Sequence, residues 1–366
     1  MRIEEELKLD YSDVLFRPKR STLKSRKDVN LLRTYRFKYS KNEWSGIPII
    51  AANMDGVGEL GVAEKLNEHG MITSLTKQHD VKKIKQNKNI KKIYPNIALS
   101  VGIKKEDFQN LDKVLKEFSF FKFICIDVAN GYTERFTNFI KSVRDKYPTK
   151  TIIAGNVVTA DMTQELVLSG ADIVKVGIGP GSICTTRMVA GIGVPQITAI
   201  MEVYRSLKGK KVKIISDGGI KFSGDIAKAI AAGADAIMMG SIFAGTDESP
   251  GKKFKIKKKF YKQYRGMGSI GAMSAGSSNR YFQKNYKDKS KFVPEGVDGR
   301  VEYKGKVSKI IYQLKGGLRS SMGYIGAKKL SDIKKNAKFI KITKAGFYES
   351  MVHSVETIEP VLNYKL

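Results

Sequence analysis

The sequence predicts a (β/α)8 TIM barrel, and three observations point to that fold class. Eight short apolar segments alternate with segments in which apolar residues recur every three or four positions, as on helices. The chain has 366 residues, a length at which an α/β barrel still forms one domain. The apolar segments run into polar or Gly-rich residues, as strands do at the functional face of a barrel. A doubly wound open sheet is the lesser alternative.

The eight expected strands follow an irregular opening that shows no strong periodicity. They lie at residues 47–52, 71–78, 97–103, 122–131, 151–158, 172–179, 213–220 and 236–243. Segments between them, such as 106–118 and 223–234, have the apolar spacing of helices, so we expect them to be crossover helices between parallel strands. Short helices within 307–337 then close the barrel, and we predict a single domain over residues 1–366.

The alternation stops after the eighth strand. Residues 250–305 are rich in Gly, Ser and Lys, and long segments of this kind in compact domains are usually lids or disordered. We therefore predict a mobile flap here, with no packed helix.

Charge and cysteine content limit the possible function classes. The formal net charge is +30, but the lysines are scattered, with local clusters at 82–92 and 252–260. Solvated lysine-rich faces are therefore favoured over dedicated nucleic-acid binding, and either suits an anionic nucleotide. The chain has no apolar run that would cross a membrane and no apolar signal-peptide centre. Two cysteines, Cys125 and Cys184, form no disulfide framework or metal motif, so we expect a cytoplasmic protein.

Residues 172–187, DIVKVGIGPGSICTTR, combine a buried strand with a Gly-rich turn that presents Cys184. Such a turn lets backbone N–H groups approach an anion, and the side chains of Ser182, Thr185 and Thr186 add hydroxyls around the thiol. Cys184 is thus a candidate nucleophile beside a candidate phosphate cradle, and the alternative is an inert buried thiol.

Polar or Gly residues follow the other expected strands as well. Because parallel strands of a barrel end on one face, these residues are expected to converge into one site. They are Asn53, Asp127, Asn130, Asn156, Asp217, Gly218, Gly219, Gly240 and Ser241.

The phrase GIGPGSICTTR resembles the active-site loop shared by IMP dehydrogenases and GMP reductases, and the similarity runs along nearly the whole chain. The resemblance implies that Cys184 attacks C2 of a purine nucleotide and that Thr186 and Glu295 manage protons there. It implies that the nucleotide is held by Met54, Ser182, Asp217, Gly218, Gly219, Gly240, Ser241, Tyr264, Met267, Gly268 and Glu295. The matching residues on the cofactor side are Asp127, Asn156, Gly177 and Gly179.

The resemblance is divided between the two enzymes. Phrases such as RPKRSTLKSR and IDVANGY are more like GMP reductase, whereas TTRMVAGIGVPQITA and YRGMGSIGAM are more like IMP dehydrogenase. The dehydrogenase must hydrolyse a covalent thioimidate. In that family an Arg-Tyr pair on a mobile flap supplies the base for this hydrolysis, and Arg280 and Tyr281 match that pair. We therefore predict an NAD-dependent IMP dehydrogenase that forms XMP. The alternative is a GMP reductase, which uses NADPH to convert GMP to IMP.

The resemblance also implies a homotetramer with K+ bound at a subunit boundary. The expected ligands are backbone carbonyls of Gly179, Gly181, Cys184, Glu349 and Ser350. Only residues 79–96 separate the second and third strands, so no regulatory domain pair is expected. A third possibility, a non-catalytic nucleotide- or RNA-binding barrel, is disfavoured by the presence of Cys184, Thr186 and Glu295.

Overall fold

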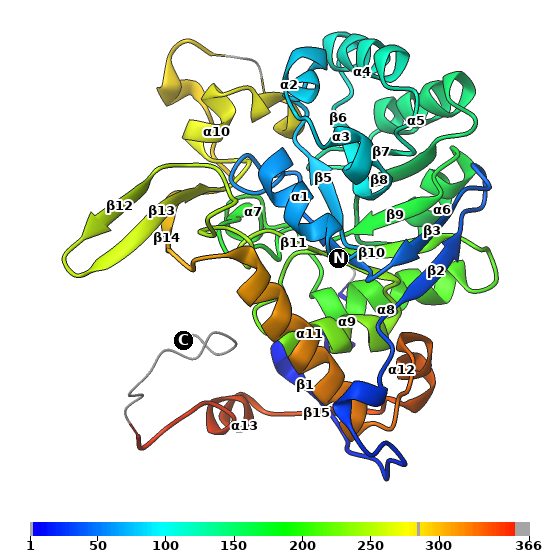
Figure 1. Cartoon of the computed structure of the whole chain (residues 1–366), viewed down its shortest axis with the longest axis vertical. Coiled ribbons are helices and arrows are strands. Elements are labelled where there is room, and N and C mark those ends of the chain that lie inside the picture. The colour runs from blue at the N-terminus through cyan, green and yellow to red at the C-terminus, as the bar shows by residue number, and fades with distance from the viewer. Residues whose placement is uncertain (1–2, 284–285, 356–366) are drawn as a thin grey trace.

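A closed barrel of eight parallel strands forms the centre of the computed structural model, which describes residues 3–283 and 286–355 (Figure 1). Neighbouring strands follow the chain order, and the last pairs with the first. The strands are β4 (Ile49–Ala51), β5 (Ile72–Leu75), β6 (Ile97–Val101), β7 (Phe123–Asp127), β8 (Thr151–Val157), β9 (Ile173–Val176), β10 (Lys213–Asp217) and β11 (Ala236–Met239). Each lies within a predicted segment, so the barrel is confirmed.

Amphipathic helices surround the barrel. In α4 (Lys105–Glu117), for example, Leu111, Val114 and Leu115 are buried, while Glu106 and Asp107 occupy the first turn. The other helices before the flap region are α1 (Leu60–Asn67), α2 (Val81–Lys85), α3 (Ile90–Ile93), α5 (Glu134–Lys146), α6 (Ala160–Leu168), α7 (Thr186–Val189), α8 (Gln196–Leu207) and α9 (Ser223–Ala232). Among the described residues, no helix is both long enough and apolar enough to span a bilayer.

One end of the barrel is closed by an antiparallel hairpin, β2 (Arg33–Arg36) and β3 (Glu43–Gly46). Tyr35 stacks on Trp44 with ring centroids 6.2 Å apart, and Phe37 meets Phe123 of β7 edge to face at 5.6 Å. These rings are buried against the inward side chains near the amino ends of the strands. Aromatic side chains therefore fill the amino end of the barrel.

The segment after β11 is more ordered than the sequence predicts. It forms a three-stranded antiparallel sheet of β12 (Lys253–Ile256), β13 (Lys259–Arg265) and β14 (Asp298–Glu302). The helix α10 (Ile270–Ser274) also forms, because the Ser269 hydroxyl accepts a hydrogen bond from the Ala272 N–H at 3.2 Å. The expectation of no packed helix here is wrong, whereas mobility stays a prediction.

The C-terminal part returns to the amino-terminal segment. Helices α11 (Val307–Tyr324) and α12 (Leu330–Asn336) pack on α9, and β15 (Phe339–Lys341) pairs with β1 (Val14–Phe16). A short helix, α13 (Lys344–Glu349), follows. The predicted single domain also includes residues 1–2, 284–285 and 356–366, which lie outside the described residues.

Candidate active site

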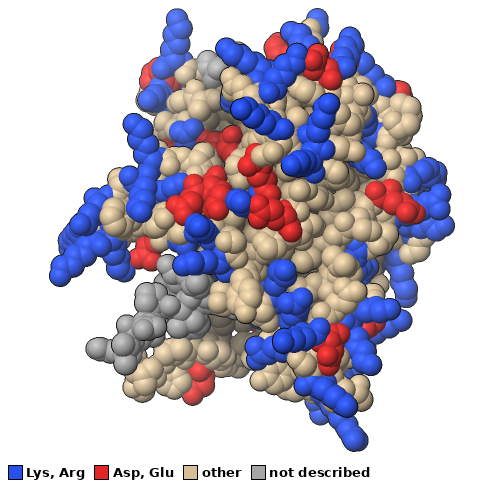
Figure 2. Space-filling model, in the orientation of Figure 1, with Lys and Arg blue, Asp and Glu red and all other residues tan. Residues whose placement is uncertain are grey.

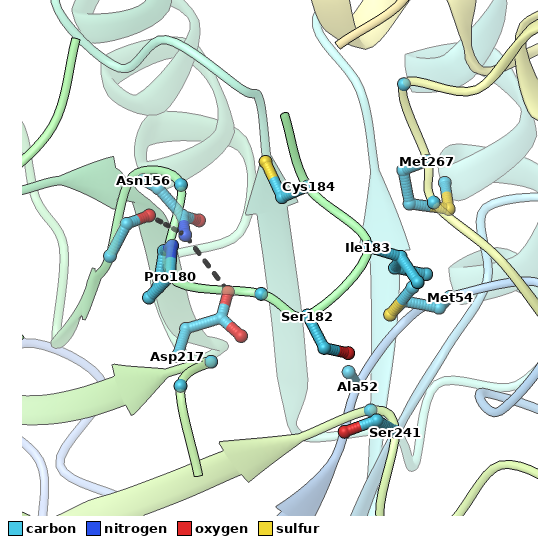
Figure 3. Close-up of a pocket in the computed structure, with 18 of the residues that line it drawn as sticks. Ala52, Met54, Asn156, Pro180, Ser182, Ile183, Cys184, Asp217, Ser241 and Met267 are labelled. Carbon is cyan, nitrogen blue, oxygen red and sulfur yellow. Dashed lines mark hydrogen bonds between the residues drawn. The ribbon is translucent and has the colours of Figure 1, made fainter. Parts of the chain in front are cut away.

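A cavity of about 160 Å³ lies at the carboxyl ends of the strands, between the barrel and the segment after β11. Figure 3 shows side chains from loops far apart in the sequence around it, with Asn156 hydrogen-bonded to Asp217. The structure brings together most of the predicted site residues here. Its lining includes Met54, Asn156, Gly177, Gly179, Gly181, Ser182, Cys184, Asp217, Gly218, Gly219, Gly240, Ser241, Tyr264, Met267, Gly268, Arg280, Tyr281 and Glu295.

The half-buried Cys184 thiol begins a chain of two hydrogen bonds. Its Sγ–H donates to Thr186 Oγ1 at 3.2 Å, and the Thr186 hydroxyl donates to Glu295 Oε2 at 2.8 Å. The Thr185 N–H also donates to the Glu295 carbonyl at 2.9 Å, so backbone contacts hold the two loops together. A thiol proton has a continuous path to a carboxylate.

Two loops of the cavity are shaped by glycine. Gly218 and Gly219 follow β10 with φ of 88° and 81°, a region that side chains other than Gly rarely adopt. A Cβ added to Gly240, after β11, would lie 2.7 Å from Met54 Sδ and 2.9 Å from the Tyr264 hydroxyl. Backbone can therefore approach a ligand closely at these positions, and Ser182 and Ser241 add hydroxyls to the same lining.

Lys175 lies at the centre of the barrel, fully buried, and was not predicted as a site residue. Its Nζ is 2.7 Å from Asp127 Oδ1 and 2.7 Å from Asp217 Oδ2, and it donates to Asn156 Oδ1. Asn156 Nδ2 in turn donates to Asp217 Oδ2 at 3.0 Å (Figure 3). This network fixes the Asp217 carboxylate at the cavity wall. The only sequence signal was one charged residue inside an apolar strand.

Replacing Lys175 with Met should lower the free energy of unfolding by about 3 kcal/mol, because two carboxylates would lose their buried cation. Urea unfolding measures this difference. The control is Lys116→Met, since the Lys116 side chain is 76% exposed and its ion pair with Asp112 contributes little. Equal stability changes in the two variants would show that the Lys175 network does not stabilise the barrel.

A second, smaller cavity of about 30 Å³ has Asn53, Met267 and Arg280 in common with the first. Its other polar lining includes Lys77, Ser100, Lys104, Asp107, Asp127, Ser277 and Asn279. Asn279 Oδ1 and Arg280 Nε are buried here without a hydrogen-bond partner in the described part of the chain. Lys77, which pairs with Asp107 at 3.2 Å, was also missed from the sequence, because nothing in its local pattern marks it.

Arg280 and Tyr281 lie side by side in a single 3₁₀ turn, residues 277–281, that covers the cavities. The Arg280 guanidinium forms an ion pair with Asp127, and its backbone carbonyl accepts from the Ala129 N–H at 3.1 Å. The Tyr281 ring packs on Gly268, where an added Cβ would lie 2.7 Å from Cζ. Burial raises the pKa of the Tyr281 hydroxyl, so this group stays protonated at neutral pH.

The family model for the IMP dehydrogenase / GMP reductase domain matches residues 8–353. The chain belongs to this family. Membership makes the protein a purine-nucleotide oxidoreductase, and the predicted family and enzyme class are confirmed.

Several relatives in the family are named GMP reductase. The one from Buchnera aphidicola subsp. Schizaphis graminum is 46% identical over 348 residues, covering 94% of this chain and 97% of that protein. GMP reductase 1 from Homo sapiens is 46% identical over 346 residues, with the same coverages. The enzyme from Vibrio campbellii is 44% identical over 344 residues, covering 93% of this chain and 97% of its own.

These relatives overturn the prediction of an IMP dehydrogenase. That prediction gave most weight to a few phrases after residue 184 and to Arg280 with Tyr281, whereas the high identity extends over nearly the whole chain. The Arg280 guanidinium is also engaged in an ion pair with Asp127, so it is not free for a hydrolytic role. The prediction therefore gave the short motif of Arg280 and Tyr281 more weight than the similarity along the whole chain.

The predicted K+ ligands do not come together within one chain. Gly179, Gly181 and Cys184 belong to the loop after β9, whereas Glu349 and Ser350 lie at the end of α13, which packs against residues 11–13. In the predicted site, Glu349 and Ser350 would come from a second copy of the chain. K+ binding and the homotetramer therefore stay predictions. Among the described residues, no group of three or more His, Cys, Asp or Glu side chains is placed to hold a metal.

Proposed function

We propose that the protein is a GMP reductase, which converts GMP to IMP with release of ammonia and consumption of NADPH. The observation that carries this proposal is the chain of hydrogen bonds from Cys184 through Thr186 to Glu295, at a cavity whose glycines suit a nucleotide. The GMP reductase names of the relatives favour GMP over IMP as the substrate.

The cavity offers separate groups for each part of GMP. Backbone N–H groups and hydroxyls near Gly219, Ser182 and Ser241 would donate hydrogen bonds to the 5′-phosphate. The Asp217 carboxylate would accept hydrogen bonds from both ribose hydroxyls, and Lys175 and Asn156 hold it in place. These contacts would bring the purine C2 to Cys184.

The first half of the reaction is a substitution at C2. Glu295 accepts the Cys184 thiol proton through the Thr186 hydroxyl, and the thiolate sulfur forms a bond to C2. The same proton returns through Thr186 to the 2-amino group, the C2–N bond breaks, and ammonia leaves. The product is a thioimidate on Cys184, and the proton taken from the thiol ends on ammonia.

The second half requires a hydride at C2. When bound, NADPH supplies that hydride. The second cavity marks the side from which such a ligand would approach, because it adjoins the first, is lined by Lys77 and Lys104, and holds the unpartnered Asn279 Oδ1 and Arg280 Nε. As the C2–H bond forms, the C2–S bond breaks and Cys184 leaves as a thiolate, which regains its proton from solvent. No step requires an activated water.

The decisive experiment supplies the protein with GMP plus NADPH, and separately with IMP plus NAD, while the absorbance of the reduced cofactor is followed. We expect NADPH to be consumed with GMP, with one ammonia formed per NADPH oxidised. Steady NADH formation from IMP and NAD, with no consumption of NADPH by GMP, would contradict the proposed function.

Arg280→Ala tests the part played by the flap. Because the proposed reaction activates no water, kcat for GMP should fall by less than about tenfold, whereas loss of a general base commonly costs about 10² to 10⁴. Release of Asp127 from its ion pair should appear mainly as a changed KM for NADPH. Steady-state kinetics and the mass of the quenched protein give the readouts. A purine adduct that accumulates on the variant in IMP and NAD would contradict this expectation.

A further inference from the structure

The hairpin formed by β12 and β13 carries the densest positive charge in the chain. Seven of the eleven residues from 252 to 262 are Lys, and no Asp or Glu occurs from 249 to 287. We call residues 252–262 the basic hairpin. It projects away from the barrel in Figure 1, and the same edge of the molecule is covered by Lys and Arg side chains in Figure 2. This charge plays no part in the proposed reaction.

The lysines of the basic hairpin are largely unneutralised. Lys259 forms an ion pair with Glu302 at 2.9 Å, whereas the exposed Lys255, Lys257 and Lys258 have no ion pair among the described residues. The lysine cluster at 82–92 likewise contains one ion-paired lysine, Lys85, which lies 2.6 Å from Glu117. A polyanion would thus find free cationic groups on the hairpin.

Aromatic rings lie between these lysines on both faces of the hairpin. In the β12–β13 register Lys255 is opposite Phe260, and Lys253 Nζ is 4.3 Å from the Phe260 ring centroid. On the other face Phe254 is opposite Tyr261, with ring centroids 6.3 Å apart. Phe254 and Phe260 are 38% and 44% exposed, so part of each ring is open to a ligand.

We propose that the basic hairpin binds single-stranded nucleic acid, with its lysines on the phosphates and its exposed rings stacked on bases. Cationic groups combined with aromatic surfaces are what proteins use to bind single strands without sequence preference. A membrane is a poorer fit, because the tip of the hairpin is Lys257 and Lys258 rather than apolar residues. The hairpin of a second copy is also a poorer fit, because each hairpin carries seven lysines and no acidic residue, so two hairpins would repel one another.

The test measures binding of a fluorescein-labelled oligouridylate of about 20 nucleotides by fluorescence anisotropy at several salt concentrations. The hairpin variant K255E/K257E/K258E should bind at least about tenfold more weakly, and its slope of log affinity against log salt should be shallower by about two. The matched control K88E/K91E/K92E changes the net charge equally, on exposed lysines of α3 and of the segment between α2 and α3, and should bind within about twofold of wild type.

Stacking is tested separately with Phe254→Ala and Phe260→Ala, each of which should weaken binding by about fivefold or more. Three results with nucleic acid would each overturn the proposal: no oligouridylate binding by the wild-type protein, an equal loss in both charge variants, or equal affinity for a duplex of the same length. Anionic vesicles that bind in place of the oligouridylate would overturn it in favour of a membrane. GMP and NADPH turnover should be unchanged in the hairpin charge variant, so a failure here is separable from failure of the proposed function.

Discussion

Cys184→Ser should lose nearly all GMP reduction, with kcat lower by a factor of about 10⁴. A serine hydroxyl has a far higher pKa than a thiol, so the relay through Thr186 to Glu295 would leave it almost entirely protonated and weakly nucleophilic. The variant should still bind GMP, because the glycine loops and Asp217 are unchanged. Steady-state kinetics and equilibrium binding of GMP measure the two effects.

The control for this result is the other cysteine. Cys125 lies in β7 with no exposed surface, and burial raises the pKa of its thiol, so it is a poor nucleophile. Cys125→Ala should leave kcat as in the wild-type protein and lower the free energy of unfolding by about 1 kcal/mol. A folded Cys184→Ser protein with substantial turnover would exclude Cys184 as the nucleophile.

Glu295→Gln should lower kcat for GMP by about 10² to 10⁴. Glutamine keeps the size of the side chain and an oxygen that accepts from the Thr186 hydroxyl, but its amide does not take up a proton at neutral pH. Both deprotonation of Cys184 and protonation of the leaving ammonia would then slow. Because Glu295 also holds Thr185 through its backbone carbonyl, the loop should stay in place and KM for GMP should change little.

Ammonia release in a single turnover is the most direct measurement of this effect, since it reports the first half of the reaction. The matched control is Glu302→Gln, which removes the same charge from β14 at the ion pair with Lys259, outside both cavities. Wild-type ammonia release by the Glu295→Gln variant would exclude the proton relay and leave Thr186 with a structural role.

The segment after β11 differs from the sequence-based prediction in two features. The composition of 250–305 predicts an irregular segment, yet backbone pairing of β13 with both β12 and β14 gives a sheet. The motif around Arg280 and Tyr281 suggests a hydrolytic pair, yet in the fold Arg280 faces Asp127. The pairing of β13 with β14 and the ion pair of Arg280 with Asp127 each depend on a partner distant in the chain, and no local pattern identifies that partner.

The sequence by itself determined the eight strands, the helices between them and the residues at the carboxyl ends of the strands, because apolar periodicity and turn chemistry are local properties. Since parallel strands of a closed barrel end on one face, convergence of Cys184, Asp217 and Gly240 followed directly. Only the tertiary structure placed Lys175 between Asp127 and Asp217. The resemblance already paired Thr186 with Glu295, and the structure adds the hydrogen bond between them across 109 residues. Contacts across such distances depend on three-dimensional packing, because a hydrogen bond or ion pair requires atoms within a few ångströms of one another.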